Sequence, residues 1–462
     1  MRMRVNVDDS ARWAPPWAGG AAKVGHSIGK MQSFSERRAR LLSSLQPGVL
    51  VLFSTPTAIR NNDVEHEYRQ SSDLFYLSGF DEPDSVLVLS SVAEREKFVL
   101  FVRPRDPERE TWDGRRAGVE GAVKDFGADA AYPIAELATR LPELLLGASE
   151  LHYSLGRHRE QDDVLLTALE GARRRGRRGA TYPTSIKDAE VVLHEQRLFK
   201  TPEELDIMRR AAQISGEAHV AAMKSARPGL NECEIDALFR GIFRKHGCER
   251  PAYEPIVGSG PNATILHYRR NNREMLDGEL LLIDAGCELE YYASDVTRTF
   301  PVNGRFSSEQ RAIYQIVLDA QEQAIAKAKV GATLDEVHLA SAEVITRGLL
   351  GLGLLEGPFE DAMKEQRYKT YYMHKCSHWL GMDVHDVGAY YRAGQGRPLQ
   401  PGMVLTVEPG IYISEQATGP AERYRGIGVR IEDDVLVTES GNEVLTEHIP
   451  RTVDAVERAC QG

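Results

Sequence analysis

Several features that mark particular classes of protein are missing from this sequence. No apolar run approaches the roughly 20 residues that span a membrane, so no membrane partner is expected. The 5 cysteines are odd in number and form no CxxC pair, which argues against a disulfide framework and a thiolate zinc site. The first residues include arginines but lack the apolar core of a secretory signal. We therefore expect a reducing compartment, with the cytoplasm as the default.

An excess of positive charge is also absent. The 57 Lys and Arg residues against 68 Asp and Glu residues give a formal net charge of −11, so no nucleic-acid partner is expected. The one basic run, residues 173–178, is predicted to be a solvated loop. The chain is 42% hydrophobic and 27% charged, which is typical of a globular protein, and its 462 residues predict two domains.

The first part of the chain alternates between strand and helix patterns. Residues 1–33 show no periodicity and are expected to be a flexible extension. Ser35 is a candidate N-cap for the first helix. The expected elements are helices over 36–45, 119–126, 134–146 and 161–173 and strands over 49–53, 85–89 and 97–102. This alternation predicts an N-terminal α/β domain over residues 34–185.

Four capping-box signals mark the second part of the chain. Each places a capping residue three positions before Glu or Gln. The pairs are Thr201 with Glu204, Asn231 with Glu234, Ser307 with Gln310, and Thr333 with Glu336. Strand patterns follow each pair of helices. Two helices and then strands, twice over, predict a duplicated α+β domain over residues 186–450 with a cleft between its halves, and a C-terminal tail over 451–462.

The rest of the chain is organised around residues 280–300. Asp284 ends an apolar run that is typical of a buried strand, and Asp295 lies in a second β-prone run. If the two runs form a hairpin centred between Leu289 and Glu290, Asp284 lies opposite Asp295. Cross-strand Cβ atoms lie about 5 Å apart, so two half-buried carboxylates would repel. A buried charge without a partner costs several kcal/mol, and a metal cation is therefore expected between them.

Three residues of the second half are candidates for the remaining ligands. His378 lies beside small residues, Glu408 follows an apolar strand, and Glu432 lies in another strand. Each residue alone is more often salt-bridged or part of a core, but together with the two aspartates they favour a metal site. Four carboxylates balance two divalent cations. Oxygen ligands with one imidazole favour Mn²⁺ and also admit Zn²⁺, Co²⁺ or Fe²⁺.

Longer motifs carry a resemblance to a known family. The second half contains ILHY, LLLIDAGCE, SDVTRTFPV, SHWLGMDVHDVG, LTVEPGIYI and RGIGVRIEDDVLVTE, and the first half contains YRQSSDLFYLSGF and WDGRR. Over residues 34–450 the chain resembles aminopeptidase P, the Xaa-Pro aminopeptidase branch of the pita-bread metallopeptidases. The resemblance implies a pita-bread catalytic domain behind an N-terminal α/β domain of the creatinase and aminopeptidase P type.

The resemblance also implies roles for individual residues. A dinuclear Mn²⁺ centre would be held by Asp284, Asp295, His378, Glu408 and Glu432, with Asp295 and Glu432 bridging the ions. Glu408 would also be the general base. The substrate side would be lined by His267, His374 and His385. Arg430 would hold a carboxylate ligand, and Trp112 would reach the active site of a neighbouring subunit, which implies a homodimer or homotetramer.

The implied activity is removal of the N-terminal residue from peptides with proline at the second position. An Xaa-Pro dipeptidase is the nearest alternative, because it shares the five ligands and the fold. A methionine aminopeptidase usually lacks the N-terminal domain, and a metal-free binding module on the same scaffold loses ligand residues that are present here. Lys375, after His374, departs from the glycine that relatives often have, and residues 390–399 are one residue longer than the family's pattern.

Overall fold

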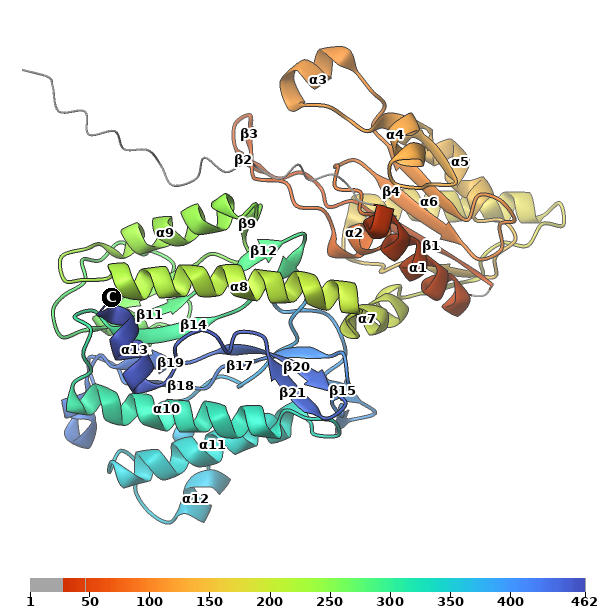
Figure 1. Cartoon of the computed structure of the whole chain (residues 1–462). Coiled ribbons are helices and arrows are strands. Elements are labelled where there is room, and N and C mark those ends of the chain that lie inside the picture. Colours follow the sequence, from red (N-terminus) through yellow and green to blue (C-terminus); the bar gives the residue numbers. More distant parts are fainter. Residues whose placement is uncertain (1–27, 46, 462) are drawn as a thin grey trace, which may run out of the picture.

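The computed structural model describes residues 28–45 and 47–461, which form two parts (Figure 1). Most of the predicted flexible extension, residues 1–27, lies outside the described residues. Its last residues belong to helix α1 (Ile28–Ser44), so the predicted helix start at Ser35 is wrong. Phe34, before the predicted cap, already lies on this helix and packs edge-on against Phe75 of helix α2 (Ser72–Ser78), with ring centroids 5.9 Å apart.

The N-terminal part is built on a six-stranded sheet with the order β6-β5-β4-β1-β7-β8. These strands are β1 (Gly48–Phe53), β4 (Val86–Ser90), β5 (Phe98–Val102), β6 (Ala130–Pro133), β7 (Glu150–His152) and β8 (Ser185–Lys187). The three strands predicted in this part are confirmed to within about a residue as β1, β4 and β5. A small hairpin of β2 (Ile59–Asn61) and β3 (Val64–Glu65) projects from the same part.

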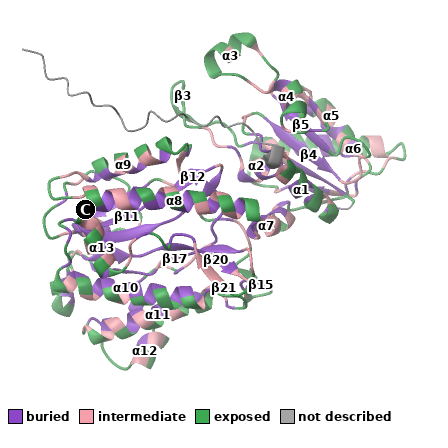
Figure 2. Cartoon of the chain, in the orientation of Figure 1, coloured by how far each residue is buried: buried purple, intermediate pink, exposed green. Residues whose placement is uncertain are grey.

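Helices cover both faces of this sheet. They are α1, α2 (Ser72–Ser78), α4 (Gly118–Lys124), α5 (Leu137–Leu144) and α6 (Arg159–Gly176), whereas α3 (Pro107–Asp113) has no buried residues and projects from this part. Leu50 of β1 belongs to one core with Leu41 of α1, whereas its neighbour Val51 belongs to another core with Leu141 of α5 and Leu165 of α6. Both faces of β1 are therefore buried, which explains its uninterrupted apolar sequence (Figure 2).

The basic run at residues 173–178 is helical over its first four residues. Helix α6 continues through Gly176, so the predicted loop is wrong there. Ala172 packs the helix into the core, and Arg173, Arg174 and Arg175 occupy its last turn. Cations at a helix C-terminus interact favourably with the helix dipole, which explains why the basic residues do not end the helix earlier.

The C-terminal part contains the four helices that the capping signals predicted. Both hydrogen bonds of the capping box are present at each of the four starts. These helices are α8 (Pro202–Ser225), α9 (Glu232–Lys245), α10 (Ser308–Lys327) and α11 (Leu334–Gly351). Helices α7 (Glu190–Leu198), α12 (Phe359–Lys364) and α13 (Val453–Cys460) complete this part, and α13 occupies most of the predicted C-terminal tail.

The strands of the C-terminal part lie between α8 and α9 on one side and α10 and α11 on the other (Figure 1). The first half provides β9 (Arg250–Pro251), β10 (Ile256–Ser259), β11 (Leu280–Asp284), β12 (Cys287–Leu289), β13 (Tyr292–Ala293) and β14 (Thr297–Pro301). The second half provides β15 (Tyr391–Arg392), β16 (Gln395–Gly396), β17 (Val404–Val407), β18 (Gly410–Tyr412), β19 (Gly428–Arg430), β20 (Asp433–Thr438) and β21 (Gly441–Val444). The element order thus repeats as the sequence predicted.

The hairpin register differs from the prediction. Asp284 pairs with Thr297, not with Asp295, so the hairpin is centred one residue further along the chain than expected. The turn consists of Glu290 and Tyr291, which both have positive φ angles, of 51° and 71°. Turns of this kind usually carry Asn or Gly. The sequence therefore gave no turn signal at these two positions.

Candidate metal centre

Asp284 and Asp295 meet despite the shifted register. Asp284 is the last residue of β11, and Asp295 lies two residues before β14. The Tyr253 hydroxyl lies 2.5 Å from Oδ1 of each carboxylate. The backbone N–H of Asp295 donates to the carboxylate of buried Asp434. The two aspartates are therefore brought together by β11, the segment before β14 and one shared tyrosine.

The second half of the domain brings three more donors to the same point. Glu408 lies between β17 and β18, and Glu432 lies between β19 and β20. The Nε2 atom of His378 is 3.3 Å from Oδ2 of Asp295 and 3.5 Å from Oε1 of Glu408. Its Nδ1 atom is 3.0 Å from the carbonyl oxygen of Trp379. A proton on Nδ1 satisfies that carbonyl and leaves the Nε2 lone pair for a metal ion.

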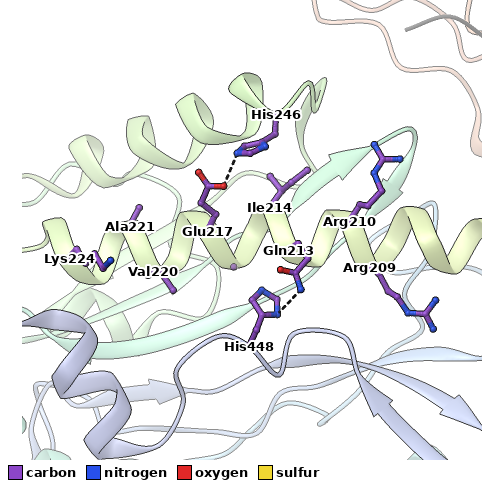
Figure 3. Close-up of a pocket in the computed structure, with 11 residues that line it drawn as sticks. Arg209, Arg210, Gln213, Ile214, Glu217, Val220, Ala221, Lys224, His246 and His448 are labelled. Atoms are coloured by element: carbon purple, nitrogen blue, oxygen red, sulfur yellow. Dashed lines mark hydrogen bonds and ion pairs between the residues drawn. The ribbon is translucent and has the colours of Figure 1, made fainter. Parts of the chain in front are cut away.

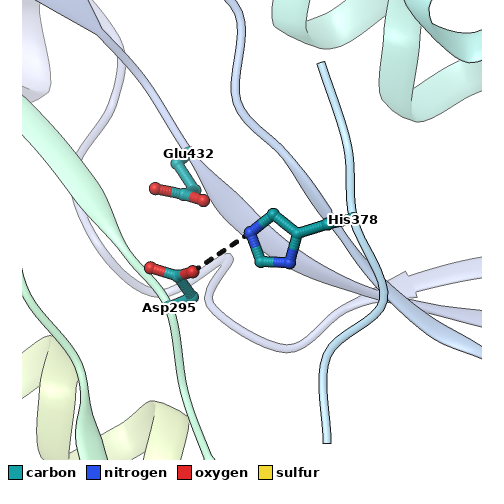
Figure 4. A group of neighbouring side chains, drawn as sticks. All are labelled: Asp295, His378 and Glu432. Atoms are coloured by element: carbon teal, nitrogen blue, oxygen red, sulfur yellow. Dashed lines mark ion pairs between the residues drawn. The ribbon is translucent and has the colours of Figure 1, made fainter. Parts of the chain in front are cut away.

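Asp295, His378 and Glu432 form a group suited to a single cation (Figure 4). Their potential ligand atoms all lie within 4.8 Å of one another. Two carboxylates and an imidazole are donors that Mn²⁺, Zn²⁺, Co²⁺ and Fe²⁺ accept. The donor chemistry of this group therefore fits a divalent metal ion.

The pKa values of the clustered carboxyl groups also indicate that positive charge would stabilise the site. Burial raises the pKa of Glu408 to about 7. The pKa values of Asp284 and Glu432 are raised as well, mainly by burial and further by neighbouring carboxylates. Burial lowers the pKa of His378, but Asp295 and Glu408 outweigh that effect and raise it to about 9. With raised pKa values, these carboxyl groups retain protons, which limits the repulsion between their negative charges. Bound cations would relieve the same repulsion.

Arg430 organises one edge of the cluster. Its Nη2 atom donates to Oδ2 of Asp284 at 2.6 Å, Nε donates to Thr297 at 3.0 Å, and Nη1 donates to the Tyr412 hydroxyl at 2.9 Å. Thr297 in turn donates to Oε2 of Glu432 at 2.6 Å. The buried guanidinium thus holds one candidate ligand directly and another through a threonine.

A cavity of about 360 Å³ opens over the cluster. All five candidate ligands line it, together with Arg430 and Tyr253. His267, His374 and His385, which the resemblance places on the substrate side, line the same cavity. The structure therefore gathers residues that are up to 179 positions apart, from Tyr253 to Glu432, around one space.

The three histidines differ in how they are held. The Nε2 atom of His374 lies 2.9 Å from the Tyr412 hydroxyl, and burial lowers the His374 pKa to about 4. The ring of His385 lies 4.3 Å from that of His378, centroid to centroid. His267 is exposed at the rim. Lys375, which departs from the family pattern, forms a 3.0 Å ion pair with Asp335 and also lines the cavity.

Tyr253 is a site residue that the sequence reasoning missed. It belongs to no helix or strand, and it precedes Glu254 and Pro255 without any periodic pattern. The two neighbouring carboxylates and burial raise its pKa well above the usual value, so the hydroxyl keeps its proton and can donate it to a carboxylate. No spacing signal in the sequence marks this residue.

Trp112 does not lie at the cavity of its own chain. It is on α3, a helix without buried residues that projects from the N-terminal part, and its side chain is 86% exposed (Figure 1). It is absent from the residues that line the cavity. Any contact with an active site would therefore have to be made with another copy of the chain.

A second cavity, of about 780 Å³, lies along α8 (Figure 3). Several of its charged groups are already paired, since Arg209 bonds Glu443, Arg210 bonds Glu290 and His246 bonds Glu217. It contains none of the candidate metal ligands. Its size alone therefore does not make it the active site.

Carboxylates with one imidazole at a cavity between two similar halves fit a metal centre. A model of the metallopeptidase family M24 matches residues 206–439, and a model of the aminopeptidase P N-terminal domain matches residues 34–153. The chain belongs to the metallopeptidase family M24, in its aminopeptidase P branch.

Relatives match the chain over nearly its whole length. The Xaa-Pro aminopeptidase of Escherichia coli strain K12 is 44% identical over 428 residues, which cover 92% of this chain and 97% of that protein. The Xaa-Pro aminopeptidase of Haemophilus influenzae is 44% identical over 427 residues, which cover 92% and 96%. The N-terminal match argues against a methionine aminopeptidase, and both relatives are aminopeptidases and not dipeptidases by name.

Solved structures agree with the fold. Aminopeptidase PepP of Pseudomonas aeruginosa superimposes with a TM-score of 0.91 at 48% identity and covers 93% of this chain and 98% of its own. Zinc-substituted aminopeptidase P of Escherichia coli in complex with product gives a TM-score of 0.90 at 43% identity, with the same coverage. Among the described residues, no helix is long and apolar enough to cross a membrane.

Proposed function

We propose that this chain is an Xaa-Pro aminopeptidase that removes the N-terminal residue from peptides with proline at the second position. The observation that carries the proposal is the meeting of three buried carboxylates, the half-buried Glu408 and His378 at one cavity of about 360 Å³, in a chain that is 44% identical to enzymes of that name. The proposed partners are peptides with a free N-terminus, and neither nucleic acid nor membrane is required.

The proposed cofactor is a pair of divalent cations, most favourably Mn²⁺. The ligands would be Asp284, Asp295, His378, Glu408 and Glu432. Four carboxylates balance the charge of two divalent cations, and the raised pKa of Glu408 and Glu432 supports the need for that charge. Bound there, the ions would lower the pKa of a water molecule and polarise the scissile carbonyl.

The chain's own residues would handle protons and position the substrate. Glu408 is the proposed general base, which accepts a proton from water and returns it to the leaving nitrogen. His267 and His385 are proposed to donate hydrogen bonds to the developing oxyanion, with His374 alongside them. Arg430 holds Asp284, and the acidic cluster would attract the free α-amino group of the substrate. Cleavage would then be limited to the first peptide bond.

A peptide panel tests this function against its nearest alternative. We would assay Xaa-Pro-Xaa tripeptides, matched tripeptides without proline and the dipeptide Gly-Pro, each with Mn²⁺ and with chelator. Metal-dependent cleavage of only the proline-containing tripeptides supports an aminopeptidase. Preferential cleavage of Gly-Pro would make the chain an Xaa-Pro dipeptidase, and cleavage that survives complete metal removal would overturn the proposed centre.

For the assembly we propose a homodimer or homotetramer in which Trp112 reaches a neighbouring active site. Its 86% exposure on a projecting helix supports this role. Light scattering combined with the tripeptide assay tests it, because a fully active monomer would exclude the role. We place the enzyme in the cytoplasm, in keeping with its five free cysteines.

A further inference from the structure

An irregular segment presents three of the site's histidines. Apart from one isolated bridge at Trp379, residues 371–390 form no helix or strand, yet they carry His374, His378 and His385. Ordering such a segment costs about 1–2 kcal/mol of backbone entropy per residue, so it needs strong anchors. Among the described residues, the ring of His385 has no hydrogen-bond partner, and its position therefore depends on the backbone beside it.

Asp386, the next residue, is the strongest anchor. Its side chain is 1% exposed, and it accepts from Lys200 Nζ at 2.9 Å and from Arg197 Nη2 at 2.7 Å. Its backbone N–H donates to the carbonyl of Trp379 at 2.9 Å. Two buried cationic side chains thus share one buried carboxylate. Removing this carboxylate would strongly destabilise the fold, because it would leave buried positive charge without a partner.

The backbone around Asp386 is shaped to allow this contact. A Cβ atom at Gly381 would lie only 2.0 Å from Oδ2 of Asp386 and 2.9 Å from Cε of Lys200. Only glycine lets the segment pass this close to the ion pair. We call Arg197, Lys200, Asp386 and Asp383, which pairs with the same guanidinium, the Asp386 clamp.

The clamp extends into the N-terminal part of the chain. Arg197 Nη1 donates to Asp73 of α2 at 2.6 Å, and Nη2 also donates to Asp383 at 2.8 Å. The hydroxyl of Ser72, on the same helix, donates to Asp383 at 2.6 Å. Helix α2 therefore contacts the segment that carries His385, directly through Ser72 and indirectly through Arg197.

We propose that Asp386 is a positioning residue that fixes His385 over the metal centre, and that the N-terminal domain contributes to this positioning through Ser72 and Asp73. The inference rests on the proposed function, since His385 is taken to act on the substrate. The N-terminal domain then serves catalysis within its own chain, in addition to any contact it makes with a neighbouring subunit.

A double-mutant cycle on activity separates positioning from simple stability. Asp386→Asn leaves Arg197 and Lys200 without the carboxylate that they share and is expected to unfold part of the protein. The main variant is therefore Asp383→Asn, because the side chain of Asp383 is 37% exposed. We would measure kcat and KM on an Xaa-Pro tripeptide for Asp383→Asn in the wild-type and His385→Ala backgrounds. The matched control is Asp162→Asn, which removes a carboxylate bonded to Tyr153 in the N-terminal part, away from this segment.

If the clamp acts through His385, Asp383→Asn lowers kcat about 10-fold in the wild-type background and less than about 2-fold in His385→Ala. Asp162→Asn changes neither. Equal losses in both backgrounds would overturn the proposal, as would no loss in either. A wild type that cleaves no Xaa-Pro peptide would overturn the proposed function instead.

A second measurement does not depend on activity. The imidazole NMR signals of His385, assigned by their loss in His385→Ala, should shift or broaden in Asp383→Asn and remain in place in Asp162→Asn. Unchanged His385 signals in Asp383→Asn would show that the clamp does not set the position of this ring.

Discussion

At the scale of single residues, the hydroxyl of Tyr253 holds the carboxylates of Asp284 and Asp295 together. Asp284 and Asp295 stood out because carboxylates interrupt apolar strand patterns, and a charge in such a setting needs a partner. Their actual bridge, the Tyr253 hydroxyl, comes from an irregular segment without any pattern. The residues that hold a ligand in place are set by tertiary contacts, which a single sequence does not encode in its spacing.

Replacement of Glu408 tests the proposed base. Glu408→Gln keeps the size of the side chain and one potential ligand oxygen but cannot accept a proton. We expect kcat to fall at least about 100-fold while the fold and most of the bound metal are retained. Steady-state kinetics and metal analysis measure both. Glu439→Gln, at an exposed site after β20, is the control, and near-normal turnover by Glu408→Gln would remove Glu408 as the base.

Arg430 offers a test of how the ligands are oriented. Arg430→Lys keeps the charge but cannot serve Asp284, Thr297 and Tyr412 together, because an ammonium group lacks the planar fork. Metal affinity should fall about 10–100-fold, as it does when a partner of a ligand is lost. Titration calorimetry with Mn²⁺ measures this change. Arg423→Lys, in a surface pair with Glu309, should bind metal like the wild type.

At the scale of elements, helix starts were easier to predict than strand pairing. A capping box is a local signal over four residues, and all four predicted boxes are formed. The register of β11 with β14 depends on a turn at Glu290 and Tyr291, and Tyr291 is held by stacking on Phe75 of α2, with centroids 3.7 Å apart. A contact across 216 positions, from 75 to 291, decides this turn.

The capping boxes can be tested one at a time. Ser307→Ala removes the side chain that accepts from the Gln310 N–H at 3.2 Å and should destabilise α10 by about 1 kcal/mol. Thermal unfolding should shift downward by a degree or two, with turnover at 25 °C unchanged. Thr167→Ala, at an exposed site inside α6, is the control. An equal decrease in unfolding temperature in both variants would mean that the Ser307 cap does not stabilise α10.

At the scale of the whole molecule, the sequence predicted two parts but not how they are joined. The junction depends on Arg197, whose side chain is only 3% exposed and which links Asp73 of the N-terminal part to Asp383 and Asp386 of the catalytic part. From the sequence alone, an arginine in a helix is expected to be exposed, because the carboxylates that pair with it come from distant segments. The contacts of α2 with the catalytic part could not be predicted from the sequence for the same reason.

This junction predicts a dependence of stability on pH. Burial would raise the pKa of Asp73, but Arg197 and His194 outweigh it and lower the pKa from 3.8 to about 2. The folded state therefore binds this proton less tightly, and the resulting stabilisation, of about 2 kcal/mol, is complete above pH 3.8 and is lost as the pH falls towards 2.

Asp73→Asn should therefore lower the unfolding temperature clearly at pH 7 and less and less below pH 4. Scanning calorimetry of both proteins from pH 7 to pH 3 measures the difference. Asp162→Asn serves again as the control. A difference that stays constant over this range would mean that the charge of Asp73 is not what stabilises the junction.

The proposed centre requires divalent cations, and the unfolding temperatures of the metal-free and Mn²⁺-loaded enzyme, measured as a function of pH, test this requirement. The pKa of Glu408 is raised from 4.5 to about 7, and that of Glu432 is also raised, so the metal-free folded state holds protons that the unfolded chain releases. The metal-free enzyme should lose stability between pH 4.5 and 7, whereas bound Mn²⁺ offsets that loss. The gap between the two unfolding temperatures should thus widen as the pH rises. Equal unfolding temperatures with and without metal across this range would contradict the account.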